Sequence, residues 1–233
     1  MESKLRPHVI CHMMVSIDGK VTGDLFNEPE CQRGYDMYFD IHKESKAKAF
    51  GFGRRTFELD FTKGFYPDLS KYSTSKIERK DFIVNDNENF YAVAFDRLGK
   101  LGWTTNQMKS EEYSFFNGAF IIEILSKEVN DAYLAYLQEK KISYIFAENI
   151  SECLVKLKKY FGIDVFLLEG GSVINGAFAK EGLIDEISLV QCPFIIGPKG
   201  KPLFNDALME NFSLQNIEKK GNFVSLRYIK ETK

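Results

Sequence analysis

Residues that bind metals or form disulfides are scarce in this chain of 233 residues. It contains four cysteines, without a C-x-x-C pair, and three histidines. Widely spaced cysteines, two of them inside strand-like stretches, indicate free and mostly buried thiols rather than disulfides or a metal site. Three histidines also leave few parts for a Ser-His-Asp triad or a metal centre. We therefore expect no metal.

Long apolar runs and an excess of one charge are also missing. No stretch approaches the roughly 20 apolar residues of a membrane span, and the N-terminal MESKLRPHVI lacks the apolar core of a signal peptide. The net charge of −2 gives no general attraction to nucleic acid or to an anionic membrane. The sequence thus predicts a cytoplasmic protein with a small-molecule partner, and with no nucleic-acid or membrane partner.

One stretch, DVFLLEGGSVINGAFAKEG, has the pattern of a strand, a glycine turn and a helix. Val165–Leu168 form a short apolar run, which predicts a strand buried on both faces of a parallel sheet. Glu169 and two glycines follow, and then apolar residues recur at helical spacing, with Ser172 placed to cap the helix and Gly182 to end it. Such a turn directs free N–H groups at the space beyond the strand and suits a phosphate. A tight turn without a ligand is the alternative.

A second turn of this kind carries positive charge. A short strand is predicted from Ala47 to Phe52, and the sequence GRRTFELDF follows it. Arg54 and Arg55 would lie at the start of a helix, where cations oppose the helix dipole. A bound phosphate would offset this, because a guanidinium group makes two-pronged contacts with phosphate oxygens. A solvated helix start is the alternative.

The remaining segments alternate between strand and helix patterns. Strands are predicted at His8–Ser16, Phe82–Val84, Phe90–Phe95, Ala119–Leu125 and Ile142–Ala147, and helices at Pro29–Lys46, Val129–Lys140 and Cys153–Phe161. Ile184–Ile196 is a strand-rich run that is broken at Pro193. A hairpin turn and its return are predicted at Asp96–Trp103, with Trp103 as a core residue or a ligand platform. Phe212–Glu218 and Asn222–Ile229 predict a closing hairpin. We therefore predict one α/β domain over residues 1–233, with a mostly parallel central sheet and an antiparallel C-terminal hairpin.

Five motifs, in order along the chain, carry a resemblance to a known family. They are VSIDGKV (15–21), GFGRRTFELDF (51–61), LLEGGSVINGAF (167–178), GLIDEISL (182–189) and PFIIGPKGKPLF (193–204). The chain resembles the reductase domain of riboflavin biosynthesis, which reduces 5-amino-6-(5-phosphoribosylamino)uracil with NADPH. This resemblance implies a three-layer, dihydrofolate reductase-like fold and a homodimer.

The resemblance also implies roles for individual residues. The two turns would bind separate parts of one NADPH, with the arginines on the 2′-phosphate. Ser16 and Asp60 would bind the substrate. Glu169, and second to it Asp18, would handle the proton that a reduced acceptor needs. Both carboxylates have alternatives: Glu169 as a cap of nearby N–H groups, and Asp18 as a turn former. The implied cofactor-binding residues are Met14, Gly53, Arg54, Arg55, Thr56, Gly170, Gly171, Ser172, Val173 and Ile174.

The chain departs from the family pattern in three places. The zinc signature of a deaminase partner domain is missing, and the segment Phe90–Leu137 looks expanded. The arginine-rich segments that hold the ribose phosphate in the pathway enzymes have no clear counterpart between Asp60 and Lys80, where lysines prevail. These differences concern the substrate more than the cofactor. A reductase of a pterin-like substrate on the same fold, or an NADPH-binding protein without catalysis, are therefore the alternative functions.

Overall fold

The computed structural model describes residues 5–84 and 86–231. The chain divides into two compact units. Unit 1 contains Lys48–Asp164 together with the N-terminal residues up to Pro7, and unit 2 contains His8–Ala47 and Val165–Lys233. A single domain over residues 1–233 stays a prediction.

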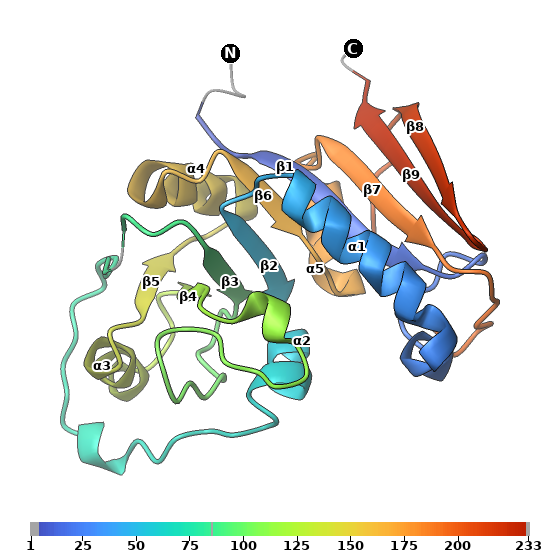
Figure 1. Ribbon diagram of the computed structural model, residues 1–233. Helices are drawn as coiled ribbons and strands as arrows, with labels where there is room; N and C mark the ends of the chain where they lie inside the picture. Colours follow the sequence, from blue (N-terminus) through green and yellow to red (C-terminus); the bar gives the residue numbers. More distant parts are fainter. Residues whose placement is uncertain (1–4, 85, 232–233) are drawn as a thin grey trace. The chain divides into compact units, whose positions relative to one another are not determined.

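Unit 1 contains a parallel sheet in the order β5-β4-β3-β2 (Figure 1). Its strands are nearly continuously apolar because helices cover both faces. On one face the ring of Phe161 in α4 contacts Tyr91, and on the other the hydroxyl of Tyr133 in α3 donates to Glu123. The elements are β2 (Ala49–Gly53), α2 (Arg54–Thr56), β3 (Tyr91–Phe95), β4 (Phe120–Leu125), α3 (Asp131–Glu139), β5 (Ser143–Phe146) and α4 (Ile150–Phe161).

Asparagine side chains start both long helices of unit 1. The side-chain oxygen of Asn130 accepts the N–H of Tyr133, and that of Asn149 accepts the N–H of Glu152. Each bond satisfies a backbone donor that has no partner within its helix. Gly162, with a φ of 62°, ends α4. The lengths of these helices are thus determined by local sequence.

Unit 2 contains a sheet in the order β6-β1-β7-β9-β8. The first three strands are parallel, and β9 and β8 add the antiparallel hairpin that the sequence predicts. Met14 of β1 lies next to α1, whereas Phe166, which is paired with Val9, contacts Phe178 of α5. Since side chains alternate along a strand, α1 and α5 cover opposite faces. The elements are β1 (His8–Val15), α1 (Gln32–Glu44), β6 (Val165–Leu168), α5 (Ser172–Lys180), β7 (Glu186–Gln191), β8 (Phe212–Lys220) and β9 (Phe223–Lys230).

Three local predictions were wrong. The segment Asp96–Trp103 forms a loop without a returning strand, because the Asp96 carboxylate accepts the N–H groups of Lys100 and Leu101. Phe82 makes a single bridge to Tyr144 instead of a full strand. Ser172 is the first residue of α5 rather than its cap; Gly171 is the N-cap, and no side chain caps the helix.

No helix among residues 5–84 and 86–231 combines the length and apolar character that crossing a bilayer requires.

Candidate functional site

The loop after β1 is organised around Asp18. One carboxylate oxygen accepts the hydroxyl of Ser16 at 2.6 Å and the N–H of Ile196 at 3.1 Å. The other oxygen accepts the N–H of Gly197 at 2.9 Å. The Ser16 hydroxyl bond and these backbone N–H groups lower the pKa of Asp18 to about 2. At neutral pH Asp18 is therefore an ionised acceptor, which favours the alternative that it holds this loop together.

Glu169 follows β6 and has a very different environment. Its side chain is fully buried, and its Oε1 lies 2.8 Å from Nδ1 of His42 in the last turn of α1. The other oxygen, Oε2, is also buried and has no hydrogen-bond partner within the part of the chain that the structure describes. Burial, followed by the charge of Glu169, raises the pKa of the Tyr38 phenol well above its usual range. One oxygen of Glu169 thus contacts His42, and the other can still form a hydrogen bond.

The glycine turn brings the chain close to neighbouring side chains. Gly170 has a φ of +95°, and a Cβ at this position would lie 2.9 Å from the Sδ-bound methyl of Met13. Gly171 then leads into α5, where the Ser172 hydroxyl is buried without a hydrogen-bond partner among residues 5–84 and 86–231. An orphaned buried hydroxyl beside a helix N-terminus, where backbone N–H groups are free, fits an anionic ligand.

In unit 1, the turn that contains Arg54 and Arg55 also contains a carboxylate that both arginines contact. Gly53 is the N-cap of α2. Nη1 of Arg54 and Nη1 of Arg55 lie 2.7 Å and 3.0 Å from the same oxygen of Glu58. The hydrogen bond from Arg55 leads the effects that lower the pKa of Glu58. Both guanidinium groups therefore already converge on one anionic oxygen at the surface.

Asp96 is a further charged residue at this edge of unit 1. Gly53 and Phe95 are paired in the parallel β2–β3 ladder, so Arg54 and Asp96 directly follow paired positions. Asp96 is 1% exposed, and burial raises the pKa of its carboxyl group, while the charge of Arg54 acts in the opposite direction. Asp96 was not among the predicted site residues, because its sequence context indicated a hairpin turn.

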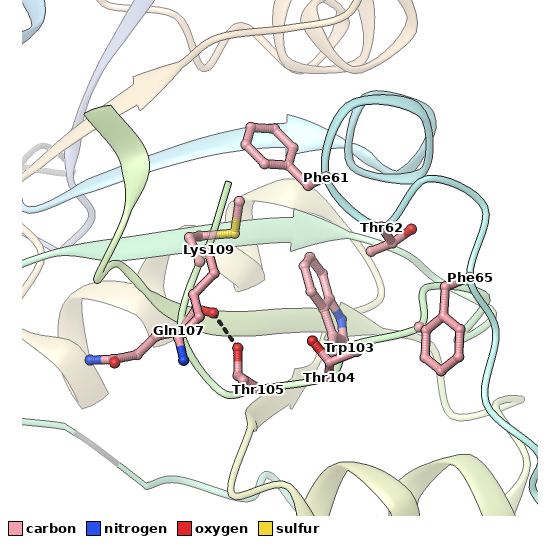
Figure 2. A pocket seen from close by; sticks show the side chains of 10 residues that line it. Phe61, Thr62, Phe65, Trp103, Thr104, Thr105, Gln107 and Lys109 are labelled. Atoms are coloured by element: carbon pink, nitrogen blue, oxygen red, sulfur yellow. Dashed lines mark hydrogen bonds between the residues drawn. The ribbon is translucent and has the colours of Figure 1, made fainter. Parts of the chain in front are cut away.

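Asp60 lies at the end of the turn in unit 1, next to a pocket. Burial raises the pKa of the half-buried Asp60 carboxyl group, Lys63 lowers it, and Glu112 raises it. In Figure 2 the Trp103 ring lies between Phe65 on one side and Thr105 on the other. The pocket has a volume of about 90 Å³ and is lined by Phe61, Thr62, Phe65, Gly102, Trp103, Thr104, Thr105, Gln107, Met108 and Lys109. Trp103 is also buried, and its indole N–H donates to Glu123, as a core residue would.

The other predicted cofactor residues differ in exposure. Met14 is 8% exposed and packs in an apolar cluster with Met37 and Phe223, so its side chain is a core side chain. Val173 is 70% exposed on the first turn of α5, and Ile174 and Thr56 are half-buried. Of these, Val173 presents an apolar side chain that is directly available to a ligand.

Within unit 2 the structure joins Ser16 directly to Asp18, and within unit 1 it joins Arg54 and Arg55 through Glu58. The predicted roles of these residues, and the binding of one nucleotide by both turns, stay predictions. Sequence reasoning also missed His42 and Glu58. The position of Glu58, four residues after Arg54 and three after Arg55, is a helical ion-pair spacing that could have revealed it.

An α/β protein with parallel strands, a C-terminal antiparallel hairpin and polar residues after the strand ends has the architecture of the dihydrofolate reductase-like class. Comparison with known families gives the more specific result. The model of the RibD C-terminal domain matches residues 7–226. The chain therefore belongs to the RibD C-terminal domain family.

Several solved structures share the fold. RibD of Acinetobacter baumannii has a TM-score of 0.66 at 18% identity, with 97% of this chain and 58% of that protein covered. A pyrimidine reductase-like protein of Corynebacterium diphtheriae has a TM-score of 0.66 at 15% identity, covering 99% and 94%. The riboflavin biosynthesis reductase Rib7 of Saccharomyces cerevisiae has a TM-score of 0.59 at 14% identity, covering 97% and 91%. At such low identities it is the TM-scores that establish the fold, which is dihydrofolate reductase-like.

One sequence relative is closer over a shorter stretch. The Bacillus subtilis (strain 168) protein YyaP, described as uncharacterized, is 46% identical over 59 residues. This stretch is 25% of this chain and 30% of YyaP. The match covers less than a third of either protein and adds no activity.

Proposed function

We propose that this protein is an NADPH-dependent reductase of 5-amino-6-(5-phosphoribosylamino)uracil or a related small heterocyclic substrate. The observation that carries the proposal is the family match over residues 7–226. The structural neighbours whose names describe pyrimidine or riboflavin-pathway reductases support the same reaction class. We further propose that the protein acts in the cytoplasm as a homodimer.

The proposed cofactor residues fit NADPH chemically. Arg54 and Arg55 hold one carboxylate oxygen between two guanidinium groups, and a phosphate oxygen is a similar acceptor. We assign them, with Gly53 and Thr56, to the 2′-phosphate. The buried Ser172 hydroxyl and the start of α5 suit a pyrophosphate; Gly170, Gly171, Val173 and Ile174 belong to the same group, with the backbone of Met14. When bound, the nicotinamide supplies the hydride.

Glu169 is the proposed proton donor. When hydride reaches the carbon of a polar double bond, the heteroatom gains negative charge and takes a proton. A buried carboxyl group with one oxygen free of hydrogen bonds suits this step. Asp18 is the second residue proposed for the catalytic site; because its hydrogen bonds keep it ionised, it would orient the reacting groups rather than give a proton. Ser16 and Asp60 are the proposed substrate-binding residues.

Cofactor selectivity tests the proposal. We expect the double variant Arg54→Ala/Arg55→Ala to weaken NADPH binding by about tenfold to a hundredfold, because each charged hydrogen bond contributes about 1.5–3 kcal/mol at most. NADH, which lacks the 2′-phosphate, should change by less than about threefold. Nicotinamide fluorescence measures both dissociation constants. Lys71→Ala, which removes another exposed cation of unit 1, is the matched control.

Equal, small changes for the two nucleotides would contradict the assignment of the arginines. Turnover with several acceptors then separates the alternatives. NADPH oxidation with a pterin but not with the pyrimidine would favour the pterin reductase. Tight NADPH binding without oxidation by any acceptor would favour the non-catalytic protein.

A further inference from the structure

The contact between His42 and Glu169 joins two residues that are 127 positions apart in the chain. Nδ1 and Oε1 are 2.8 Å apart, and the two side chains are 4% and 0% exposed. Two lone pairs facing each other at this distance would repel, so one proton lies between the two atoms. The carboxyl group cannot rotate without losing this bond. Its orientation is therefore fixed by the helix that carries His42.

Besides His42, one neighbouring group interacts directly with the carboxyl group. From α1, the Tyr38 hydroxyl faces Glu169; burial, the charge of Glu169 and a hydrogen-bond interaction with it raise the pKa of the phenol, which is therefore neutral. From β1, burial lowers the pKa of His12, which lies 3.0 Å from the Ser188 hydroxyl and 3.0 Å from the carbonyl oxygen of Tyr38. Burial also raises the pKa of the Cys11 thiol on β1. All three groups are neutral at neutral pH.

The two oxygens of Glu169 consequently differ. Oε1 is engaged by His42, whereas Oε2 is buried and has no hydrogen-bond partner in the described ranges 5–84 and 86–231. A buried polar atom without a partner costs about 1–3 kcal/mol, so each one in a native structure calls for an explanation, and a catalytic role is one such explanation. A ligand group that bonds to Oε2 would remove this cost.

We propose that His42 is the positioning residue for Glu169: its contact with Oε1 reserves Oε2 for the reacting group. This inference rests on the proposed reductase function. In the reaction the hydride brings two electrons to the acceptor carbon, and Oε2 gives its proton to the acceptor heteroatom. The carboxylate that remains keeps its bond to His42 and regains a proton from water. His42 itself does not touch the acceptor.

The contact can be observed without substrate or cofactor. A hydrogen-bonded proton between an imidazole nitrogen and a carboxyl oxygen gives a far-downfield signal in the ¹H NMR spectrum. The chain has three histidines, so single replacements assign each ring. We expect the signal to disappear in His42→Leu and in Glu169→Leu, which has no acceptor, and to persist in His8→Gln. A signal that persists in Glu169→Leu would contradict the contact.

Kinetics test the positioning role. We expect His42→Leu to lower kcat by about tenfold or more with the dissociation constant of NADPH unchanged, because only the orientation of Glu169 is lost. His42→Asn places an amide N–H near the position of Nδ1 and should recover most of kcat. If the NMR signal of the contact is present but neither His42→Leu nor His42→Asn alters kcat, His42 does not position Glu169. The proposed reductase function would be unaffected by this result.

The test does not depend on the folding of any single variant. If His42→Leu does not fold, the comparison of His42→Asn with wild type and the spectrum of Glu169→Leu still decide the proposal. If the wild-type protein turns over no acceptor, the reductase function fails, and the NMR measurement reports on the contact alone. A pH profile of kcat that is the same in wild type and His42→Asn supports positioning by the N–H donor, and a large shift between them contradicts it.

Discussion

The two strand-to-helix turns share a sequence pattern but differ in physical character. In unit 1, Arg54 and Arg55 lie at the surface and converge on Glu58. In unit 2, Glu169 and Ser172 are buried, and each has an oxygen without a hydrogen-bond partner in the described part of the chain. The charges of the turn in unit 1 are thus compensated by a neighbouring side chain, whereas the turn in unit 2 has buried oxygens that can still accept hydrogen bonds.

This difference indicates different tasks. Exposed ion pairs contribute about 0–1 kcal/mol, so Glu58 can give way to an incoming anion at small cost. Buried groups held by tertiary contacts keep their geometry, as a group that touches reacting atoms needs to. We therefore assign charge recognition to the turn in unit 1 and proton handling to the turn in unit 2.

The largest effect should come from the buried carboxyl group. We expect Glu169→Gln to lower kcat by about a hundredfold to ten-thousandfold, the usual contribution of a general acid, because an amide cannot give the proton. The NADPH dissociation constant should change by less than about threefold. Stopped-flow absorbance measures the first quantity and fluorescence titration the second. Glu218→Gln, at an exposed position on β8, is the control.

If Glu169→Gln keeps wild-type kcat, the assignment of proton handling to the buried turn is wrong.

A backbone change tests the close packing of the turn in unit 2. Gly170→Ala should reduce the free energy of unfolding by about 2 kcal/mol, because its φ is +95° and the new Cβ would lie 2.9 Å from Met13. Gly19→Ala in the same unit has a φ of +72° and no atom within 4 Å, so it shows the cost of the backbone conformation alone. Urea unfolding compares the two. Equal losses would show that Met13 yields without cost.

A substitution in the turn of unit 1 should have a smaller effect, and it should improve a function rather than impair it. Glu58→Gln removes the carboxylate that both arginines contact, so NADPH binding should tighten by about twofold to fivefold. Fluorescence titration at low and high salt measures this change. Glu112→Gln, which removes an exposed partner of Lys63, is the control. Weaker NADPH binding in Glu58→Gln would place the phosphate away from the arginines.

The smallest effects should be opposite pH dependences at two aspartates. The folded-state pKa of Asp18 is lowered from 3.8 to about 2, so its contribution to stability is present above its unfolded pKa and is lost as the pH falls towards 2. The pKa of Asp96 is raised, so its contribution is present at low pH and is lost as the pH rises through the folded pKa. Unfolding of Asp18→Asn and Asp96→Asn over an acidic pH series measures both.

For each variant, the difference from wild type in the free energy of unfolding is plotted against pH. If this difference changes in the same direction for Asp18→Asn and Asp96→Asn, the environments described for the two carboxyl groups are wrong.

Local pattern was enough to predict most of the elements. The apolar run Val165–Leu168 and the glycines after it identified β6 and the turn, because a doubly buried strand needs no polar alternation. The C-terminal hairpin followed from alternating residues around Gly221. The loop at Asp96–Trp103 could not be predicted, since its shape depends on one buried carboxylate that binds two N–H groups.

The candidate site was only partly visible in the sequence. Glu169 was found because it directly follows a predicted strand, and Arg54 because it follows another predicted strand after one glycine. His42 lies within an amphipathic helix pattern, and nothing near it in the sequence indicates a partner 127 residues away. The compensation of two arginines by Glu58 requires a helical turn at Phe57–Phe61, where the structure has a π-helical turn. Long-range packing therefore determines which oxygen of Glu169 is available.

Hydride transfer is the most direct test of the central proposal. The purified protein is mixed with NADPH and 5-amino-6-(5-phosphoribosylamino)uracil, and the nicotinamide absorbance is followed over time. The account predicts that NADPH is consumed in proportion to the acceptor by the wild type, and that consumption is slowed by about a hundredfold or more in Glu169→Gln although NADPH still binds. Tight NADPH binding by the wild type without any consumption in the presence of this acceptor would contradict it.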